Sequence, residues 1–114
     1  RQALQADLEG LAEDMGMSFE LEDLLDEQPV MMHDVLKASL QEQCHKQQLS
    51  YMHLPSGAGH DAQIFGEQIP AAMLFVPSRG GRSHCPEEWS DGYDLAVATN
   101  VLHDALIALQ NKEL

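Results

Sequence analysis

The sequence predicts a domain of the α/β class with a largely parallel sheet. Helical and strand patterns alternate along the chain after Pro29, and this order is typical of layered α/β domains. The run at residues 71–76 is continuously apolar and is bounded by prolines, which favours a strand buried on both faces. We therefore expect 71–76 to be the core strand, with the other elements arranged around it.

Two elements are expected before Pro29, and the strand among them differs from the core strand in its pattern of apolar residues. Leucines and a methionine recur at helical spacing in residues 4–15, and Gly16 stands where a helix C-cap glycine belongs. Residues 17–22 alternate apolar and polar side chains, as in a strand with one face in water. The acidic run at 22–27 predicts a crossing between two structural units.

Apolar stripes and turn signals define the remaining elements. Leu36, Leu40 and Cys44 form one stripe at helical spacing. The last helix carries four leucines on one expected face, and Ser90 or Asp91 can cap its start. The elements expected after Pro29 are a helix at 33–47, a strand at 49–54, a short helix at 61–66, the core strand at 71–76, a loop at 77–90 and a final helix bearing Leu95, Leu102, Leu106 and Leu109.

Composition restricts the class of protein. A length of 114 residues with 44% hydrophobic residues fits one small globular domain or part of a larger one. The formal net charge of -13 argues against nucleic acid and anionic membranes as partners, because both require clustered basic side chains. The two cysteines form no disulfide pattern, and no apolar run is long enough to span a bilayer. These features predict a cytoplasmic protein.

The first candidate site loop is residues 56–62, Ser-Gly-Ala-Gly-His-Asp-Ala. Its small residues would let backbone N–H groups approach an anionic or polarised oxygen, although a tight strand-to-helix turn is the more common reason for such a loop. His60 could donate a hydrogen bond to a carbonyl oxygen or transfer a proton, and the simpler alternative is a capping or surface histidine. The carboxylate of Asp61 is expected to interact favourably with the positive end of the helix dipole at the start of the short helix.

The second candidate loop contains residues 83–88, Ser-His-Cys-Pro-Glu-Glu. An imidazole flanked by carboxylates makes His84 a reasonable metal ligand, but a catalytic zinc needs about three protein ligands. Cys85 is better explained as a small loop residue than as a ligand. Arg79 and Arg82 lie in the same loop against the overall negative charge, and they either serve the site or are solvated.

The two histidine motifs, with Met-Leu-Phe-Val-Pro-Ser at 73–78 between them, resemble the C-terminal end of the M20 metallopeptidase superfamily. The branch they resemble most acts on carbamoyl groups and includes allantoate amidohydrolase, N-carbamoyl-L-amino-acid hydrolase and β-alanine synthase. The resemblance implies that residues 30–114 are the C-terminal part of a zinc-peptidase-like, metal-binding catalytic domain. Residues 1–29 are similar, more loosely, to the last helix and strand of the family's inserted lid (dimerisation) domain.

The resemblance also implies a chemistry. Family enzymes hold two divalent ions, zinc or manganese, whose bridging water attacks the carbamoyl or ureido carbon with a glutamate as general base. By position, His84 is a ligand of one metal, and Glu88 supports that histidine without binding the ion. Gly59 and His60 line the substrate pocket, with His60 stabilising charge on the substrate oxygen. The expected partners are a small ureido substrate and, in the full-length protein, a second copy of the chain.

The chain departs from the family in what it lacks. It shows no His-x-Asp pair and no Glu-Glu ligand motif in residues 1–28, so the general base and the other ligands are expected upstream. The sequence therefore predicts a C-terminal fragment that is inactive alone. Two alternatives remain: a non-catalytic dimerising or ligand-binding module derived from the family, and another M20 branch such as an aminoacylase or dipeptidase. The pair His60-Asp61 favours the carbamoyl branch over the latter.

Overall fold

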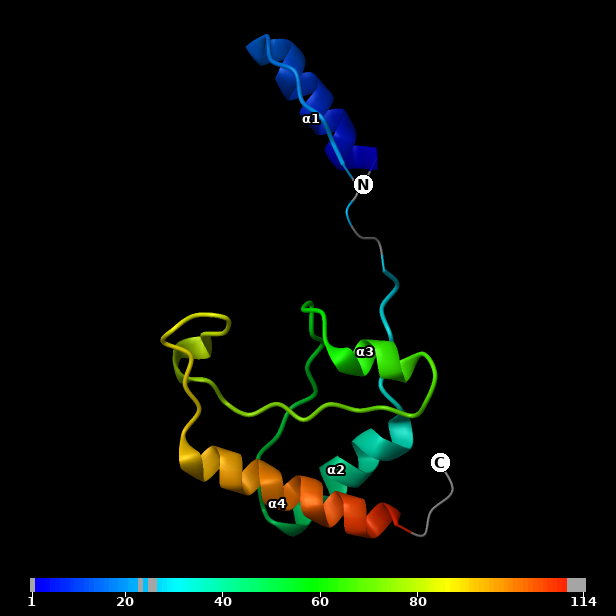
Figure 1. The fold of residues 1–114 in the computed structure, drawn as a ribbon, viewed down its shortest axis with the longest axis vertical. Coiled ribbons are helices and arrows are strands. Elements are labelled where there is room, and N and C mark those ends of the chain that lie inside the picture. Colours follow the sequence, from blue (N-terminus) through cyan, green and yellow to red (C-terminus); the bar gives the residue numbers. More distant parts are fainter. Residues whose placement is uncertain (1, 23, 25–26, 111–114) are drawn as a thin grey trace.

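The structure is a computed structural model that describes residues 2–22, 24 and 27–110. Of the predicted acidic crossing at 22–27, Asp23, Leu25 and Asp26 lie outside the described residues. Figure 1 shows the helices in chain order. They are α1 (Gln2–Met15), α2 (Asp34–Lys46), α3 (Asp61–Gly66), the short 3₁₀ turn η1 (Arg79–Gly81) and α4 (Gly92–Leu109).

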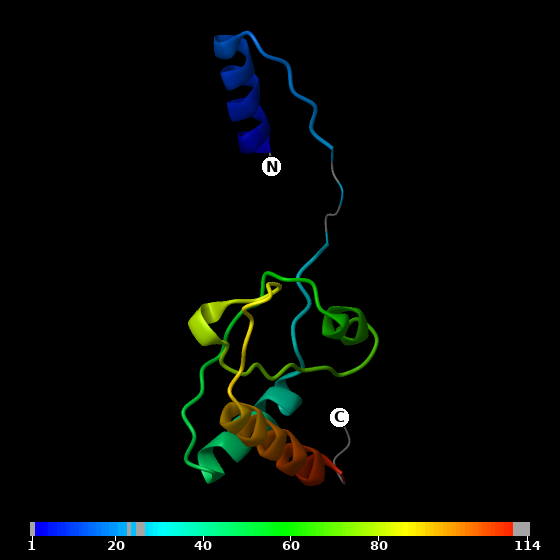
Figure 2. The same ribbon diagram turned by 60° about the vertical axis from the view of Figure 1, so that its left-hand side comes forward.

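Helix α1 confirms the first predicted helix and its glycine cap. Gly16 has φ of 59°, and its N–H donates to the Glu13 carbonyl at 3.2 Å. The Met17 N–H donates to the Ala12 carbonyl at 2.8 Å, which completes a Schellman motif. No residue of α1 is buried, and Figures 1 and 2 show it standing apart from the other helices. The assignment of residues 1–29 to a lid domain stays a prediction.

Within the described chain, α2 and α4 are the helices that pack against each other. The contact is made by small and medium-sized side chains, because Val101 and Ala105 are each only 2% exposed and Ser39 is 4% exposed. The Ser39 hydroxyl donates to the Ala105 carbonyl at 3.5 Å, a long bond that the close approach of the two backbones allows. Cys44 is also buried, and desolvation raises the pKa of its thiol, which keeps it protonated.

The leucines of the predicted apolar stripes lie beside this contact rather than in it. Leu102, Leu106 and Leu109 of α4 line one groove, as expected for leucines on one face, although Leu102 and Leu106 are 47% and 60% exposed. The stripe on α2 predicted a helix, which is formed, and within it Cys44 is buried while Leu36 and Leu40 are half-exposed. These leucines line an open apolar groove of about 390 Å³. Its lining residues include Leu36, Leu40, Phe65, Leu102, Leu106 and Leu109.

The predicted α/β class with a largely parallel sheet is wrong, because no strand is formed among residues 2–22, 24 and 27–110. The segments 17–22, 49–54 and 71–76 carry strand-like patterns but have no neighbours with which to form a hydrogen-bonded ladder. The His33 N–H donates to the Ala71 carbonyl at 2.8 Å, and no ladder continues from that bond in the described residues. Apolar patterning gives a segment its tendency to be buried, whereas a sheet also requires backbone partners.

One close contact in the fold gives a test of its packing. A Cβ added at Gly66, the last residue of α3, would lie 2.8 Å from Val30 Cγ1 and 3.3 Å from Met32 Cε. We expect Gly66→Ala to lower the free energy of unfolding by about 1–3 kcal/mol, measured by urea denaturation. Gly92→Ala at the start of α4 is the control, because nothing lies within 4 Å of its added Cβ. Equal unfolding midpoints for the two variants would contradict the packing argument.

Candidate functional site

His60 directly precedes α3 with an extended backbone, and its side chain makes no capping hydrogen bond. The capping alternative for His60 is therefore wrong. Its Nε2 lies 2.7 Å from the Ser56 hydroxyl oxygen. The ring also meets Phe75 in an edge-type contact, with centroids 5.6 Å apart and an interplanar angle of 65°. A residue of the apolar run at 71–76 and a residue of the first loop thus hold the same imidazole.

The backbone of the first loop is open to approach from solvent. The Ala58 N–H donates to the Ser56 hydroxyl oxygen at 3.3 Å, which closes a short turn before α3. Gly57 and Gly59 have nothing within 4 Å of an added Cβ, and neither has positive φ. Neither packing nor backbone conformation in this structure therefore requires glycine there. A ligand that comes close to the backbone would require it, and the assignment of Gly59 to substrate binding stays a prediction.

The second loop is fastened at its base by a small polar network. The Asp91 carboxylate accepts from Arg79 Nη2 at 3.0 Å and from Trp89 Nε1 at 3.1 Å. The Arg79 N–H donates to the Trp89 carbonyl at 2.7 Å, and its guanidinium lies 5.8 Å from the centre of the Trp89 ring. Asp91 precedes α4 as predicted, but its side chain does not cap the helix because it binds these partners instead. Arg79 therefore joins the two ends of the loop, and Arg82 lies 3.8 Å from Glu87.

His84 lies in this loop with a strained backbone. Its φ is 56°, in the left-handed region that costs a non-glycine residue of order 1 kcal/mol. Glu88 Oε2 accepts the His84 N–H at 2.9 Å, so the carboxylate holds the backbone of the histidine. The His84 side chain itself is exposed. Glu88 and His84 are thus brought together, through the main chain and not through the ring.

The described residues do not compose a metal centre by themselves. Nowhere in the described ranges do three His, Cys, Asp or Glu side chains gather so that they could hold an ion. His84 is therefore a single donor, and no reaction step through a metal follows from this chain. The other histidines lie elsewhere: His45 and His53 flank Tyr51, with ring centroids 5.2 and 5.8 Å away, and His103 pairs with Asp104.

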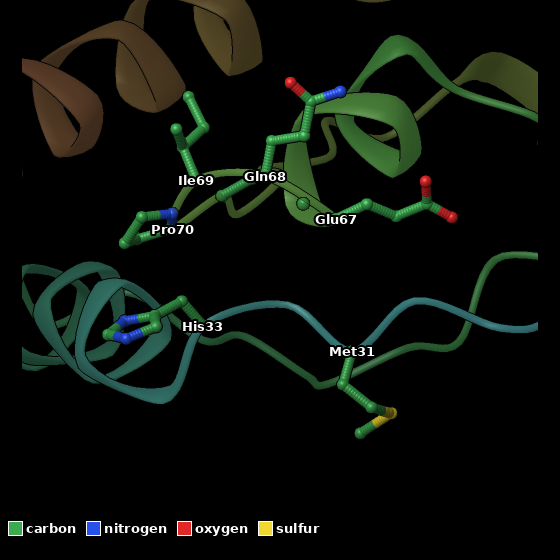
Figure 3. Close-up of a pocket in the computed structure, with 8 residues that line it drawn as sticks. Met31, His33, Glu67, Gln68, Ile69 and Pro70 are labelled. Carbon is green, nitrogen blue, oxygen red and sulfur yellow. The ribbon is translucent and has the colours of Figure 1, made fainter.

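One further feature was not predicted from the sequence. A pocket of about 300 Å³ lies between the segment leading into α2 and the end of α3. Figure 3 shows the side chains that line it. It is lined by Met31, His33 and residues 66–71, and none of the predicted site residues contributes to it. The buried Nδ1 of His33 has no hydrogen-bond partner among the described residues. In the sequence, the one indication of this pocket is the position of His33 between an apolar segment and the start of a helix, and this indication is weak.

Comparison with known proteins decides the family. A sequence profile described as peptidase family M20/M25/M40 matches residues 6–108. The chain belongs to this family. The resemblance drawn from the two histidine motifs is therefore confirmed.

Several relatives of this M20/M25/M40 chain are named as amidohydrolases. The chain is 40% identical to an allantoate amidohydrolase of Escherichia coli (strain K12), over 89% of this chain and 25% of the relative. It is 38% identical to an allantoate amidohydrolase of Bacillus subtilis (strain 168), over 95% and 26%. An N-carbamoyl-L-amino-acid amidohydrolase of Paenarthrobacter aurescens is 33% identical over 87% and 24%.

This M20/M25/M40 chain corresponds to one part of its relatives. It spans about a quarter of the length of the curated relatives it matches. Family membership supports a hydrolase, and members of the family generally bind divalent metal ions. None of the helices in the described ranges is long and apolar enough to cross a membrane.

Proposed function

We propose that the protein containing this chain hydrolyses the carbamoyl or ureido C–N bond of allantoate or of N-carbamoyl-L-amino acids. The observation that carries the proposal is the likeness, over most of the chain, to relatives named for those two activities. The first loop supports it physically. It combines an open glycine backbone with an imidazole held by Ser56 and Phe75, and such a surface suits a polar, oxygen-rich ligand.

In this proposal each loop has one task. Gly59 lets the substrate approach the backbone, and His60 donates a hydrogen bond to the substrate oxygen as negative charge grows on it. His84 offers its exposed imidazole to one divalent ion, while Glu88 fixes the backbone from which the imidazole projects. When bound, the ions would supply Lewis acidity and an activated water. Zinc or manganese would suit a single imidazole donor, which does not distinguish between them.

A second candidate is a non-catalytic ligand-binding or dimerising module. In the described ranges no three metal-binding side chains gather together, which is compatible with this module and equally with a fragment whose other ligands would lie upstream. We expect residues 1–114 alone to lack hydrolase activity under either proposal. A cytoplasmic homodimer remains part of the first proposal.

The test is an activity assay on the product of the complete reading frame. After removal of metal and refilling with zinc or manganese, the protein should release product from allantoate or from an N-carbamoyl-L-amino acid. The chain 1–114 alone serves as the control and should release none. A full-length protein that binds metal and cleaves neither substrate class would overturn the proposed function. Full-length protein that binds ureido compounds without cleaving them would support the module.

A further inference from the structure

We propose that Ser56 is a positioning residue that fixes the orientation and the proton position of the His60 ring. The proposal rests on the proposed function, because it names how His60 is prepared for a substrate oxygen. Its starting observation is the 2.7 Å separation of the Ser56 hydroxyl oxygen and His60 Nε2. The two residues lie four positions apart, on either side of the glycine pair.

The direction that we propose for this hydrogen bond, from the Ser56 hydroxyl to His60 Nε2, gives each group of the Ser56 side chain a partner. A serine hydroxyl has one hydrogen to donate and can accept through its lone pairs. The Ala58 N–H donates to the Ser56 oxygen at 3.3 Å and occupies one of its two lone pairs. Within the described residues, His60 Nε2 is the acceptor that lies within hydrogen-bond distance of the Ser56 hydroxyl, so we assign the hydroxyl hydrogen to Nε2. Nε2 then accepts, and in the neutral ring the proton must lie on Nδ1. Ser56 thereby selects one tautomer of His60.

The remaining contacts restrict the ring further. Phe75 meets it at 65°, which limits rotation of the imidazole plane. The Gln63 N–H donates to the His60 carbonyl at 2.9 Å and ties the residue to the first turn of α3. Apart from Ser56, no hydrogen bond to the His60 ring occurs in the described ranges. The Nδ1–H group is therefore free to donate, and its direction is set.

A free donor held in this way suits a particular class of ligand atom. A carbonyl or ureido oxygen accepts from an N–H, and it accepts more strongly as negative charge develops on it during attack at the adjacent carbon. In the opposite tautomer the proton lies on Nε2 and points towards Ser56. Nδ1 then presents a lone pair to the substrate oxygen, and this lone pair repels those of the oxygen. Selection of the tautomer is thus worth more in the transition state than in the ground state.

The experiment compares Ser56→Ala and Ser56→Thr in the full-length protein. Ring nitrogen chemical shifts of ¹⁵N-histidine-labelled protein, recorded in mildly alkaline buffer, report the tautomer without any need for activity. We expect Nδ1–H at His60 in the unmodified protein and in Ser56→Thr, and a mixture of tautomers in Ser56→Ala. We also expect Ser56→Ala to lower kcat about tenfold or more with little change in KM, and Ser56→Thr to restore it.

Ser50→Ala is the matched control, since Ser50 is an exposed serine of the same segment with no role in the loop. It should leave the tautomer and kcat unchanged. An Nε2–H tautomer in the unmodified protein would overturn the proposal, as would a Ser56→Ala protein with the original tautomer and kcat. If the expected tautomer is found but no ureido substrate is cleaved, the proposed function fails while the positioning of His60 stands.

Discussion

His84→Ala in the full-length protein is expected to lower bound metal and hydrolase activity together. The structure places the His84 imidazole on the surface of a loop whose base is fastened by Arg79, Trp89 and Asp91. Loss of an outer partner of a metal-ligating histidine typically costs about 10–100-fold in affinity or activity. Loss of the ligand itself should cost more than about 100-fold. Metal content by elemental analysis and kcat/KM on a cleaved ureido substrate measure the two effects.

His103→Ala is the matched control for this prediction. His103 is also an exposed histidine, but it lies on α4 and pairs with Asp104 at 3.0 Å. Its loss should change neither metal content nor rate. Glu88→Ala should weaken metal binding less than His84→Ala, and Glu88→Gln less still, because an amide oxygen can accept the same His84 N–H. A fully metallated and active His84→Ala protein would show that His84 is not a ligand.

The elements that could be predicted from sequence are those whose signals are local. Residues 61–66 form a helix with the predicted bounds, and the predicted helix at 33–47 occurs as α2. Gly16 caps α1 because the left-handed conformation there is set by a few adjacent residues. In each case the deciding interactions lie within one or two turns of the chain.

The predictions that failed concern features that depend on residues far away in the sequence. The run at 71–76 is apolar enough for a core strand, yet Phe75 is 50% exposed because no neighbouring strands cover it in the described ranges. Helical spacing placed the leucines of α4 on one face, but it could not show that α2 packs against Val101 and Ala105 instead. A stripe at helical spacing indicates that a helix has an apolar face, and the partner decides which part of that face is buried.

The candidate site divides in the same way. Composition located both loops, because small residues beside a histidine and carboxylates beside a histidine are visible in the sequence. The contacts that give these residues their roles were not visible. Glu88 reaches the His84 N–H because His84 has φ of 56°, and Ser56 reaches His60 because the intervening turn folds back. Such geometry depends on backbone angles that residue types alone do not determine.

His60→Ala in the full-length protein is expected to lower kcat about 10²–10³-fold while metal content stays unchanged. The loss has the size seen when one donor to a developing oxyanion is removed. His60 can fill this role because its ring is held by Ser56 and Phe75 and has one nitrogen free. His60→Gln should recover part of the rate, since an amide N–H can still donate. Steady-state kinetics and elemental analysis on the same preparations measure both quantities.

His53→Ala is the control, because His53 is an exposed histidine of the same segment and contacts Gln41 and Tyr51 rather than the loop. It should leave kcat unchanged. Loss of metal in His60→Ala would mean that the roles of His60 and His84 have been confused.

A double-mutant cycle tests the coupling between Ser56 and His60 directly, because in this proposal Ser56 acts only through His60. Ser56→Ala should therefore cost nothing further once His60 is alanine, whereas independent costs would show that Ser56 contributes by another route.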